Sequence, residues 1–208
     1  MTLHILRFIF PIFLSVMFHS AISHAEPYAK KIPQYQTIVL AGGCFWCIES
    51  DYEKLDGIIK AISGYSGGQI TNPTYQQVSS GTSGHIEVVE LTYNSEIISY
   101  EKILDYFWHH IDPTRDDGQF CDRGPQYRPA IFYKNEKEKE AILKSARHIE
   151  KTKTFDAPLK VEFIPQATFW PAEEYHQDYY KKSPIRYKYY RFSCRRDARV
   201  KELWGSSH

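Results

Sequence analysis

The chain has 208 residues, a formal net charge of +1 and 42% hydrophobic residues, and 15% of its residues are aromatic. A chain of this length and apolar content can form one domain with a sizeable core. The near-zero net charge provides no electrostatic field that would attract a polyanion, so we expect no nucleic-acid partner.

The first 25 residues have the pattern of a targeting segment. His4 and Arg7 precede an apolar run at 8–18, and Ser23 and Ala25 place small residues before Glu26. The apolar run is shorter than the about 20 residues that a membrane-spanning helix needs, which favours a cleavable signal peptide over a retained membrane anchor. We therefore expect a signal peptide at 1–25 and one domain at 26–208 with a C-terminal tail from about residue 180. The protein is predicted to be exported, periplasmic or secreted, with no stable membrane anchor.

Hydrophobic periodicity predicts alternating strands and helices. An apolar run at 37–41 is typical of a buried strand, an amphipathic run at 48–55 of a helix, and the run at 58–65 of a second strand. Strand, helix and strand in this order predict an α/β sandwich. Further along, periodicity predicts a short helix at 75–78, a strand at 85–93, a helix at 99–111 with one apolar stripe, and a loop at 112–126. A strand at 127–133, a helix at 136–151, a strand at 159–164 and a last helix from Pro171 to Tyr179 follow. Thr74, Ser99 and Asn135 are the predicted N-caps of the helices that follow them.

Cys44 lies where the first strand gives way to the first helix. The free N–H groups and the dipole of a helix start favour a thiolate, which is the nucleophilic form of cysteine. Gly42 and Gly43 allow a tight turn before it. Phe45 and Trp46 could form the wall of a small apolar pocket beside the sulfur. The sequence therefore predicts a reactive cysteine at this junction.

The spacing of Cys44 and Cys47 also fits two other kinds of site. A zinc site needs two more ligands, usually as a second close pair, whereas Cys121 and Cys194 stand alone, so we expect no metal site. A thioredoxin-like dithiol remains an alternative from the spacing alone. Four cysteines in an exported chain would ordinarily suggest two structural disulfides. A domain of this size does not depend on them, and we expect some of the cysteines to cycle.

The strand at 85–93 places a carboxyl on an apolar face whichever way it is turned. Alternation puts Glu87 with Val89 and Leu91, and it puts Glu90 with Ile86 and Val88. A carboxyl that is buried on such a face keeps its proton to higher pH and can act as an acid. The alternation does not decide between the two glutamates, nor against an ordinary solvated strand end.

Several separated segments together resemble one known family, the peptide methionine sulfoxide reductases of type A. They follow the family's order and are the stretches at 42–46 (GCFW with its preceding glycine), 64–68 (GYSGG), 72–75 (NPTY), 81–87 (GTSGHIE), 112–114 (DPT), 122–128 (DRGPQYR) and 171–177 (PAEEYHQ). The resemblance implies a single α+β domain, a two-layer sandwich in which a mixed sheet packs against helices. It also implies reduction of the S epimer of methionine sulfoxide, free or in proteins, to methionine.

Matching positions imply roles for individual residues. Cys44 would be the nucleophile and Glu87 the acid, which decides the strand ambiguity in favour of Glu87. Tyr75 and Tyr127 would hydrogen-bond around the sulfoxide oxygen, and Asp122 would help to organise that loop. Phe45 and Trp46 would hold the methyl group of the substrate.

The implied chemistry is consistent with these residue types. A sulfoxide oxygen leaves only when it gains a proton as a thiolate attacks sulfur, so the site needs a low-pKa thiol beside a high-pKa carboxyl. The sulfenic acid that forms at Cys44 would condense with a second thiol, and an external dithiol such as thioredoxin would reduce the resulting disulfide. No bound cofactor is expected.

The recycling thiols depart from the family's commoner pattern. Many members have Gly where this chain has Cys47, and the glycine-rich tail that often carries recycling cysteines is absent. We favour Cys194, in a tail expected to be mobile, and Cys47, three residues along the helix from Cys44, over Cys121. A general dithiol-disulfide oxidoreductase and a disulfide-stapled domain without enzymatic activity remain the rival hypotheses.

Overall fold

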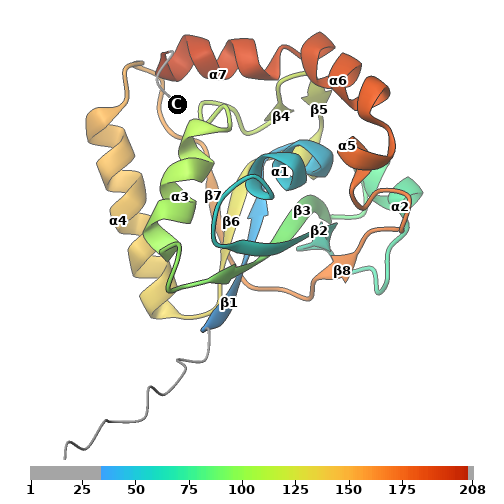
Figure 1. The fold of residues 1–208 in the computed structure, drawn as a ribbon, viewed down its shortest axis with the longest axis horizontal. Coiled ribbons are helices and arrows are strands. Elements are labelled where there is room, and N and C mark those ends of the chain that lie inside the picture. The colour runs from blue at the N-terminus through green and yellow to red at the C-terminus, as the bar shows by residue number, and fades with distance from the viewer. Residues whose placement is uncertain (1–33, 206–208) are drawn as a thin grey trace, which may run out of the picture. The chain divides into compact units, whose positions relative to one another are not determined.

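The computed structural model describes residues 34–205 as one α/β domain (Figure 1). The signal peptide predicted at 1–25 lies outside the described residues. The elements in chain order are β1 Tyr35–Ala41, α1 Phe45–Tyr52, β2 Ile58–Ser66, α2 Tyr75–Ser79, β3 Ile86–Asn94, α3 Tyr100–His109, β4 Gly118–Gln119, β5 Asp122–Arg123, the 3-10 helix η1 Pro125–Tyr127, β6 Ala130–Tyr133, α4 Glu136–Thr152, β7 Glu162–Pro165, β8 Trp170–Pro171, α5 Tyr179–Lys182, α6 Pro184–Ser193 and α7 Arg196–Trp204.

A six-stranded sheet forms the centre of the domain, in the order β7-β6-β1-β3-β2-β8. Strands β1, β2 and β3 pair antiparallel, and the pair β6 and β7 is parallel, so the sheet is mixed as expected. In the register of β1 with β3, Leu40 lies opposite Val89. Both side chains are fully buried and belong to the main hydrophobic core. The predicted fold class is therefore confirmed.

Helices α1, α3 and α4 cover one face of this sheet (Figure 1). Their apolar stripes contribute Ile48, Phe107, Trp108 and Ile142 to the main core. Each predicted N-cap is present, because Ser99 and Asn135 accept hydrogen bonds from backbone N–H groups in the first turns of α3 and α4, and Thr74 forms a capping box on α2. The opposite face of the sheet carries a smaller apolar cluster that includes Val88 and Phe132.

The last part of the chain differs from the prediction in two ways. Pro171 does not begin a helix, because residues 170–171 form the edge strand β8 on β2, where the N–H that proline lacks is not needed. The predicted mobile tail is instead three helices, α5, α6 and α7, which follow one another along one edge of the domain (Figure 1). Leu203 and Trp204 of α7 are buried in the main core, which fixes this segment. Among residues 34–205 no helix combines the length and hydropathy needed to cross a bilayer.

Candidate active site

Cys44 is the N-cap residue of α1, directly after the end of β1. Gly43 before it has φ +86°, a conformation that side chains rarely adopt, and a Cβ there would lie 2.5 Å from Cβ of Gln119. The two glycines therefore allow the sharp turn that brings the cysteine to the start of the helix. Cys44 is 6% exposed, so its sulfur lies just below the surface.

Glu87 of β3 lies beside Cys44 and is 2% exposed. Its Oε2 accepts a hydrogen bond of 3.0 Å from the backbone N–H of Phe45, the first residue of α1. Burial raises the pKa of Glu87 to about 8, although the bond from Phe45 opposes the shift. Glu87 is therefore protonated at neutral pH and can donate a proton. Glu90, the alternative in the sequence, is only partly buried on the opposite face of the strand.

The resting ionisation of Cys44 differs from the prediction. The sequence predicts a thiolate stabilised by the helix start, but burial raises the pKa of the Cys44 thiol, and Cys47 and Glu87 raise it further. The helix start does not counter this effect, because the N–H of Phe45 is occupied by Glu87 and the Cys44 side chain makes no capping bond. Cys44 is thus a thiol in the resting site, and its proton must leave during the reaction.

Cys47 faces Cys44 one helical turn along α1 and is 2% exposed. The hydrogen bond from the Cys44 thiol lowers the pKa of Cys47, and the guanidinium groups of Arg196 and Arg191 act in the same direction against its burial. The sulfur of Cys47 is therefore placed both to receive a proton from Cys44 and to react with it. Neither cysteine is part of a disulfide in this structure.

A small cavity of about 60 Å³ opens beside the sulfur of Cys44. It is lined by all seven predicted catalytic and substrate-binding residues and by one more, which are Cys44, Phe45, Trp46, Tyr75, Glu87, Asp122, Tyr127 and Tyr190. Tyr75 and Tyr127 both line the cavity; burial raises the pKa of Tyr75 to about 12 and raises the pKa of Tyr127 well above its usual range. Both tyrosines therefore stay neutral and can donate hydrogen bonds to an oxygen in the cavity.

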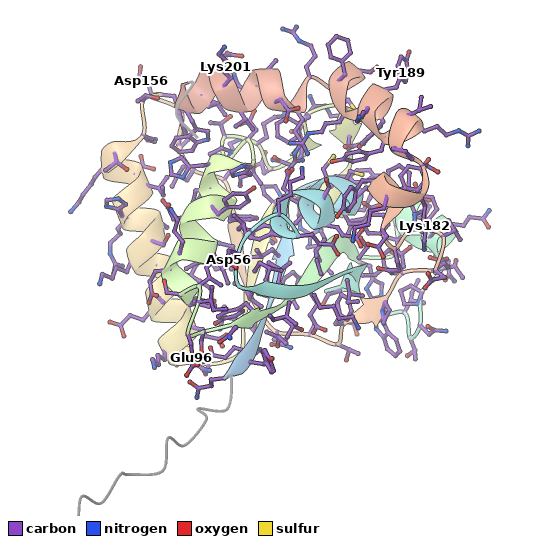
Figure 2. The ribbon with its side chains drawn as sticks, in the orientation of Figure 1. Asp56, Glu96, Asp156, Lys182, Tyr189 and Lys201 are labelled. Carbon is purple, nitrogen blue, oxygen red and sulfur yellow. A yellow bond between two sulfur atoms is a disulfide. The ribbon has the colours of Figure 1, made fainter. Side chains whose placement is uncertain are left out.

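Tyr190 is the wall residue that the sequence analysis did not single out. It lies on the inner side of α6, and its hydroxyl donates a hydrogen bond of 2.6 Å to Oδ2 of Asp122. Its ring meets Trp46 edge-on, with 5.8 Å between centroids. The neighbouring Tyr189 is 74% exposed and points away from the domain (Figure 2). Nothing in the composition of the tail distinguishes the two, because the choice depends on the rotation of a helix that was not predicted.

Trp46 is held in place by the segment before α5. Its indole N–H donates to Nδ1 of His176 at 3.1 Å, and its ring stacks on Tyr179 at 3.8 Å between centroids. This segment is fixed to the sheet in turn, because Glu49 accepts hydrogen bonds of 2.9 Å from both the hydroxyl of Ser63 and the N–H of Asp178. The apolar wall of the cavity is therefore built by residues distant in sequence, and it is rigid.

The other two cysteines form a disulfide. Cys121, one residue before Asp122, is joined to Cys194 at the end of α6, with 4.8 Å between the Cα atoms. Cys194 is therefore not bonded to Cys44 in this structure. The disulfide ties the loop that carries Asp122 to the helix that carries Tyr190.

A buried free cysteine beside a buried carboxyl is the arrangement of a thiol-dependent oxidoreductase. The family model for peptide methionine sulfoxide reductase matches residues 36–208, and the chain belongs to this family.

Known relatives agree with this assignment. The chain is 55% identical to the Vibrio cholerae protein MsrA/MsrB over 83% of its own length, although it spans only 46% of that protein. It is 49% identical to MsrA of Halalkalibacterium halodurans over 80% of this chain and 95% of the relative. Among solved structures, Mxr1 from Saccharomyces cerevisiae in reduced form is similar with a TM-score of 0.69 and 29% identity, covering 73% of this chain and 87% of the yeast chain. A further structure of the yeast protein is a complex with Trx2; it has a TM-score of 0.51 and 23% identity and covers 70% of this chain and 85% of that one.

Proposed function

We propose that this chain reduces the S epimer of methionine sulfoxide, free or in proteins, to methionine, with Cys44 as nucleophile and Glu87 as acid. The observation that carries the proposal is the cavity, because a free thiol and a protonated carboxyl face the same small space. Tyr75 and Tyr127 supply further donors for the sulfoxide oxygen, and Phe45 and Trp46 supply an apolar wall for the methyl group.

The reaction proceeds in two chemical steps. The sulfur of Cys44 attacks the sulfur of the sulfoxide while Glu87 donates its proton to the oxygen, and Cys47, as a thiolate, takes up the proton of the Cys44 thiol. The protonated oxygen then passes to Cys44, and the bond between the two sulfurs breaks as methionine leaves. Methionine and a sulfenic acid at Cys44 result. Cys47 then attacks this sulfenic acid, forming a Cys44–Cys47 disulfide and releasing water. The sulfoxide is reduced by two electrons and the two thiols are oxidised by two.

An external dithiol must return those two electrons. We propose a thioredoxin-like protein for this role, as found in the complex of yeast Mxr1 with Trx2. The exposed Cys121 makes the Cys121–Cys194 disulfide accessible to such a reductant, whereas Cys44 and Cys47 are buried. The reduced Cys121 and Cys194 pair then passes the two electrons to the Cys44–Cys47 disulfide by thiol–disulfide exchange, which re-forms the Cys121–Cys194 bond. No organic cofactor or metal is needed for this sequence of steps, since all redox changes occur at sulfur. The signal-peptide pattern at 1–25 supports export of the protein and removal of this segment. We therefore propose that the reaction takes place outside the cytoplasm.

The alternative function as a general dithiol-disulfide oxidoreductase is not favoured. Such an enzyme must bring a protein disulfide to its reactive sulfur, whereas Cys44 and Cys47 are 6% and 2% exposed. A cavity of about 60 Å³ admits a methyl sulfoxide group but no protein disulfide. The buried Glu87 has no role in plain disulfide exchange.

The variant Cys47→Ser is expected to complete one reduction and then stop at the sulfenic acid, because no thiol faces Cys44. With one equivalent of sulfoxide and no reductant, about one methionine per enzyme should form. Mass spectrometry should then find a dimedone adduct at Cys44. Wild-type enzyme should give no adduct, and Cys194→Ser, the matched control, should behave like wild type. Cys47→Ser protein that is fully reduced beforehand, freed of reductant and then found to form a Cys44–Cys194 disulfide would transfer the resolving role to Cys194.

The activity is expected to depend on pH through Glu87. Because burial raises the pKa of Glu87 to about 8, the proton that the reaction needs is present below that pH and is lost above it. We therefore expect kcat/KM for methionine S-sulfoxide to fall as pH rises through about 8. The measurement is kcat/KM as a function of pH from 6 to 10, with enough reductant that re-reduction of the enzyme does not limit the rate. A rate that keeps rising across this range would argue against an acid at Glu87.

A further inference from the structure

A second pocket, of about 650 Å³, lies outside the active site and has a disulfide in its wall. It is bounded by the loop at 112–123, by Lys160 and by the junction of α6 with α7, and Cys194 is among its lining residues. Cys121, the partner of Cys194, is exposed. The volume falls in the range of about 300 to 1,000 Å³ that is typical of small-molecule sites. A small molecule in this pocket would therefore touch a reducible bond.

The pocket is lined by more cationic than anionic side chains. The cations are Arg115, Arg123, Lys160, Arg195 and Arg199, and the acids are Asp112, Asp116, Asp117 and Glu202. Arg199 is committed to the buried Asp112 at 2.8 Å. The pair of Lys160 with Asp116, at 3.2 Å, is exposed and therefore weak. A ligand carboxylate can replace Asp116 at Lys160 at little cost.

Arg195 is the cation best placed for a ligand. It directly follows Cys194, it is exposed, and it has no ion-pair partner in the part of the chain that the structure describes. Its φ of +55° turns the chain between α6 and α7, so the side chain borders the pocket beside the sulfur. An exposed cation beside a disulfide attracts a thiol that carries negative charge.

We propose that this pocket binds a small thiol of amino-acid or short-peptide type that carries carboxylates, and that the bound thiol opens the Cys121–Cys194 disulfide. The cations of the pocket hold the carboxylates, and the acids can accept the ammonium group of the same ligand. This inference extends the proposed function by naming a second reductant for the protein, and it does not depend on the reaction at Cys44.

The exchange balances in two steps. The thiolate of the ligand attacks Sγ of Cys194, the bond to Cys121 breaks, and Cys121 leaves as a thiolate that takes up a proton from the solvent. A second molecule of the small thiol then attacks the ligand sulfur of the mixed disulfide. Cys194 is released as a thiol, and one small-molecule disulfide forms. Two protein sulfurs are reduced and two ligand thiols are oxidised.

The test uses the full chain with Cys44→Ser and Cys47→Ser, so that Cys121–Cys194 is its only disulfide. Opening of this bond is followed by mass spectrometry with three thiols. Glutathione carries two carboxylates and an ammonium group, 2-mercaptoethanol carries no charge besides its thiolate, and cysteamine carries an ammonium group only. Rates are compared at equal thiolate concentration. We expect the rate with glutathione to saturate and to exceed that with cysteamine by about tenfold or more. The mixed disulfide should map to Cys194.

A charge-reversed pocket provides the control. Adding Arg195→Glu and Lys160→Glu should abolish saturation by glutathione and slow 2-mercaptoethanol much less, because the reacting thiolate is the only charge of that reagent. An unchanged circular dichroism spectrum checks that the variant is folded. Lys188→Glu, an exposed change on α6 outside the pocket, should have no effect. The inference would be overturned if the rate depended only on thiolate concentration for all three thiols. It would also be overturned if the mixed disulfide mapped to Cys121. The proposed function would survive that result, because no sulfoxide enters the assay.

Discussion

Replacement of Cys44 by serine is expected to reduce the rate of methionine S-sulfoxide reduction to background, a loss of about 10⁴-fold or more. A serine hydroxyl does not ionise near neutral pH and cannot form a sulfenic acid, so both chemical steps are removed. The fold should be unaffected, because the substitution exchanges sulfur for oxygen at a residue whose side chain makes no capping bond. The measurement is methionine formation with dithiothreitol as reductant.

The matched control for this variant is Cys121→Ser combined with Cys194→Ser. It also replaces cysteines, but those of the Cys121–Cys194 disulfide outside the cavity. Dithiothreitol is small enough to reduce the Cys44–Cys47 disulfide directly, so the control should keep a measurable rate with this reductant. Activity that persists in Cys44→Ser would remove the nucleophile from the mechanism and with it the proposed function.

The second large effect is expected for Glu87→Gln. Loss of a general acid typically costs about 10² to 10⁴ in rate, and the loss here should appear mainly in kcat, because the proton is needed only as the oxygen leaves. Glutamine keeps an oxygen that can accept the N–H of Phe45, so the start of α1 should hold its position. Steady-state kinetics with methionine S-sulfoxide provides the measurement.

Glu90→Gln is the control, since Glu90 lies on the same strand with its side chain on the other face. It should leave the rate and its pH dependence unchanged. In Glu87→Gln the fall in rate above pH 8 should disappear, because that fall is assigned to Glu87 alone. Equal losses of rate in the two variants would mean that the substitutions act by disturbing the strand and not by removing the proton of Glu87.

The sequence was sufficient for the parts of the fold that depend on local patterns. The strand before Cys44, the caps at Thr74, Ser99 and Asn135 and the apolar stripe of α3 were all predicted and are all present. These features depend on neighbours a few residues apart, which periodicity and capping preferences report directly. Seven residues of the cavity were predicted through the resemblance to a family, since they come from four separate segments, and Tyr190 was missed.

The remaining features depend on contacts that no local pattern records. The sequence Pro171-Ala172-Glu173-Glu174 is typical of a helix start, yet Glu173 instead accepts hydrogen bonds of 2.8 Å from the N–H of Tyr75 and the hydroxyl of Tyr65. The helices α6 and α7 carry many charges, and their order comes from burial of Trp204 and from the ion pair of Arg191 with Asp51 at 2.8 Å. Tertiary contacts override the local signal in both places.

The ionisation of Cys44 was missed for a related reason. A helix start favours a thiolate only when its N–H groups are free, and whether they are free depends on what lies beside the first turn. Here Glu87 occupies the N–H of Phe45. The pairing of Cys121 with Cys194 was likewise beyond the sequence, because one disulfide among four cysteines can form in six ways and the other two cysteines remain free.

The most direct test of the mechanism is to treat wild-type enzyme with one equivalent of methionine S-sulfoxide, without reductant, and to map its disulfides by mass spectrometry. The mechanism predicts one methionine released, a new Cys44–Cys47 disulfide and an unchanged Cys121–Cys194 disulfide. A methionine product with Cys44 still a free thiol would show that the oxidising equivalent never reached this sulfur, and it would contradict the proposed reaction.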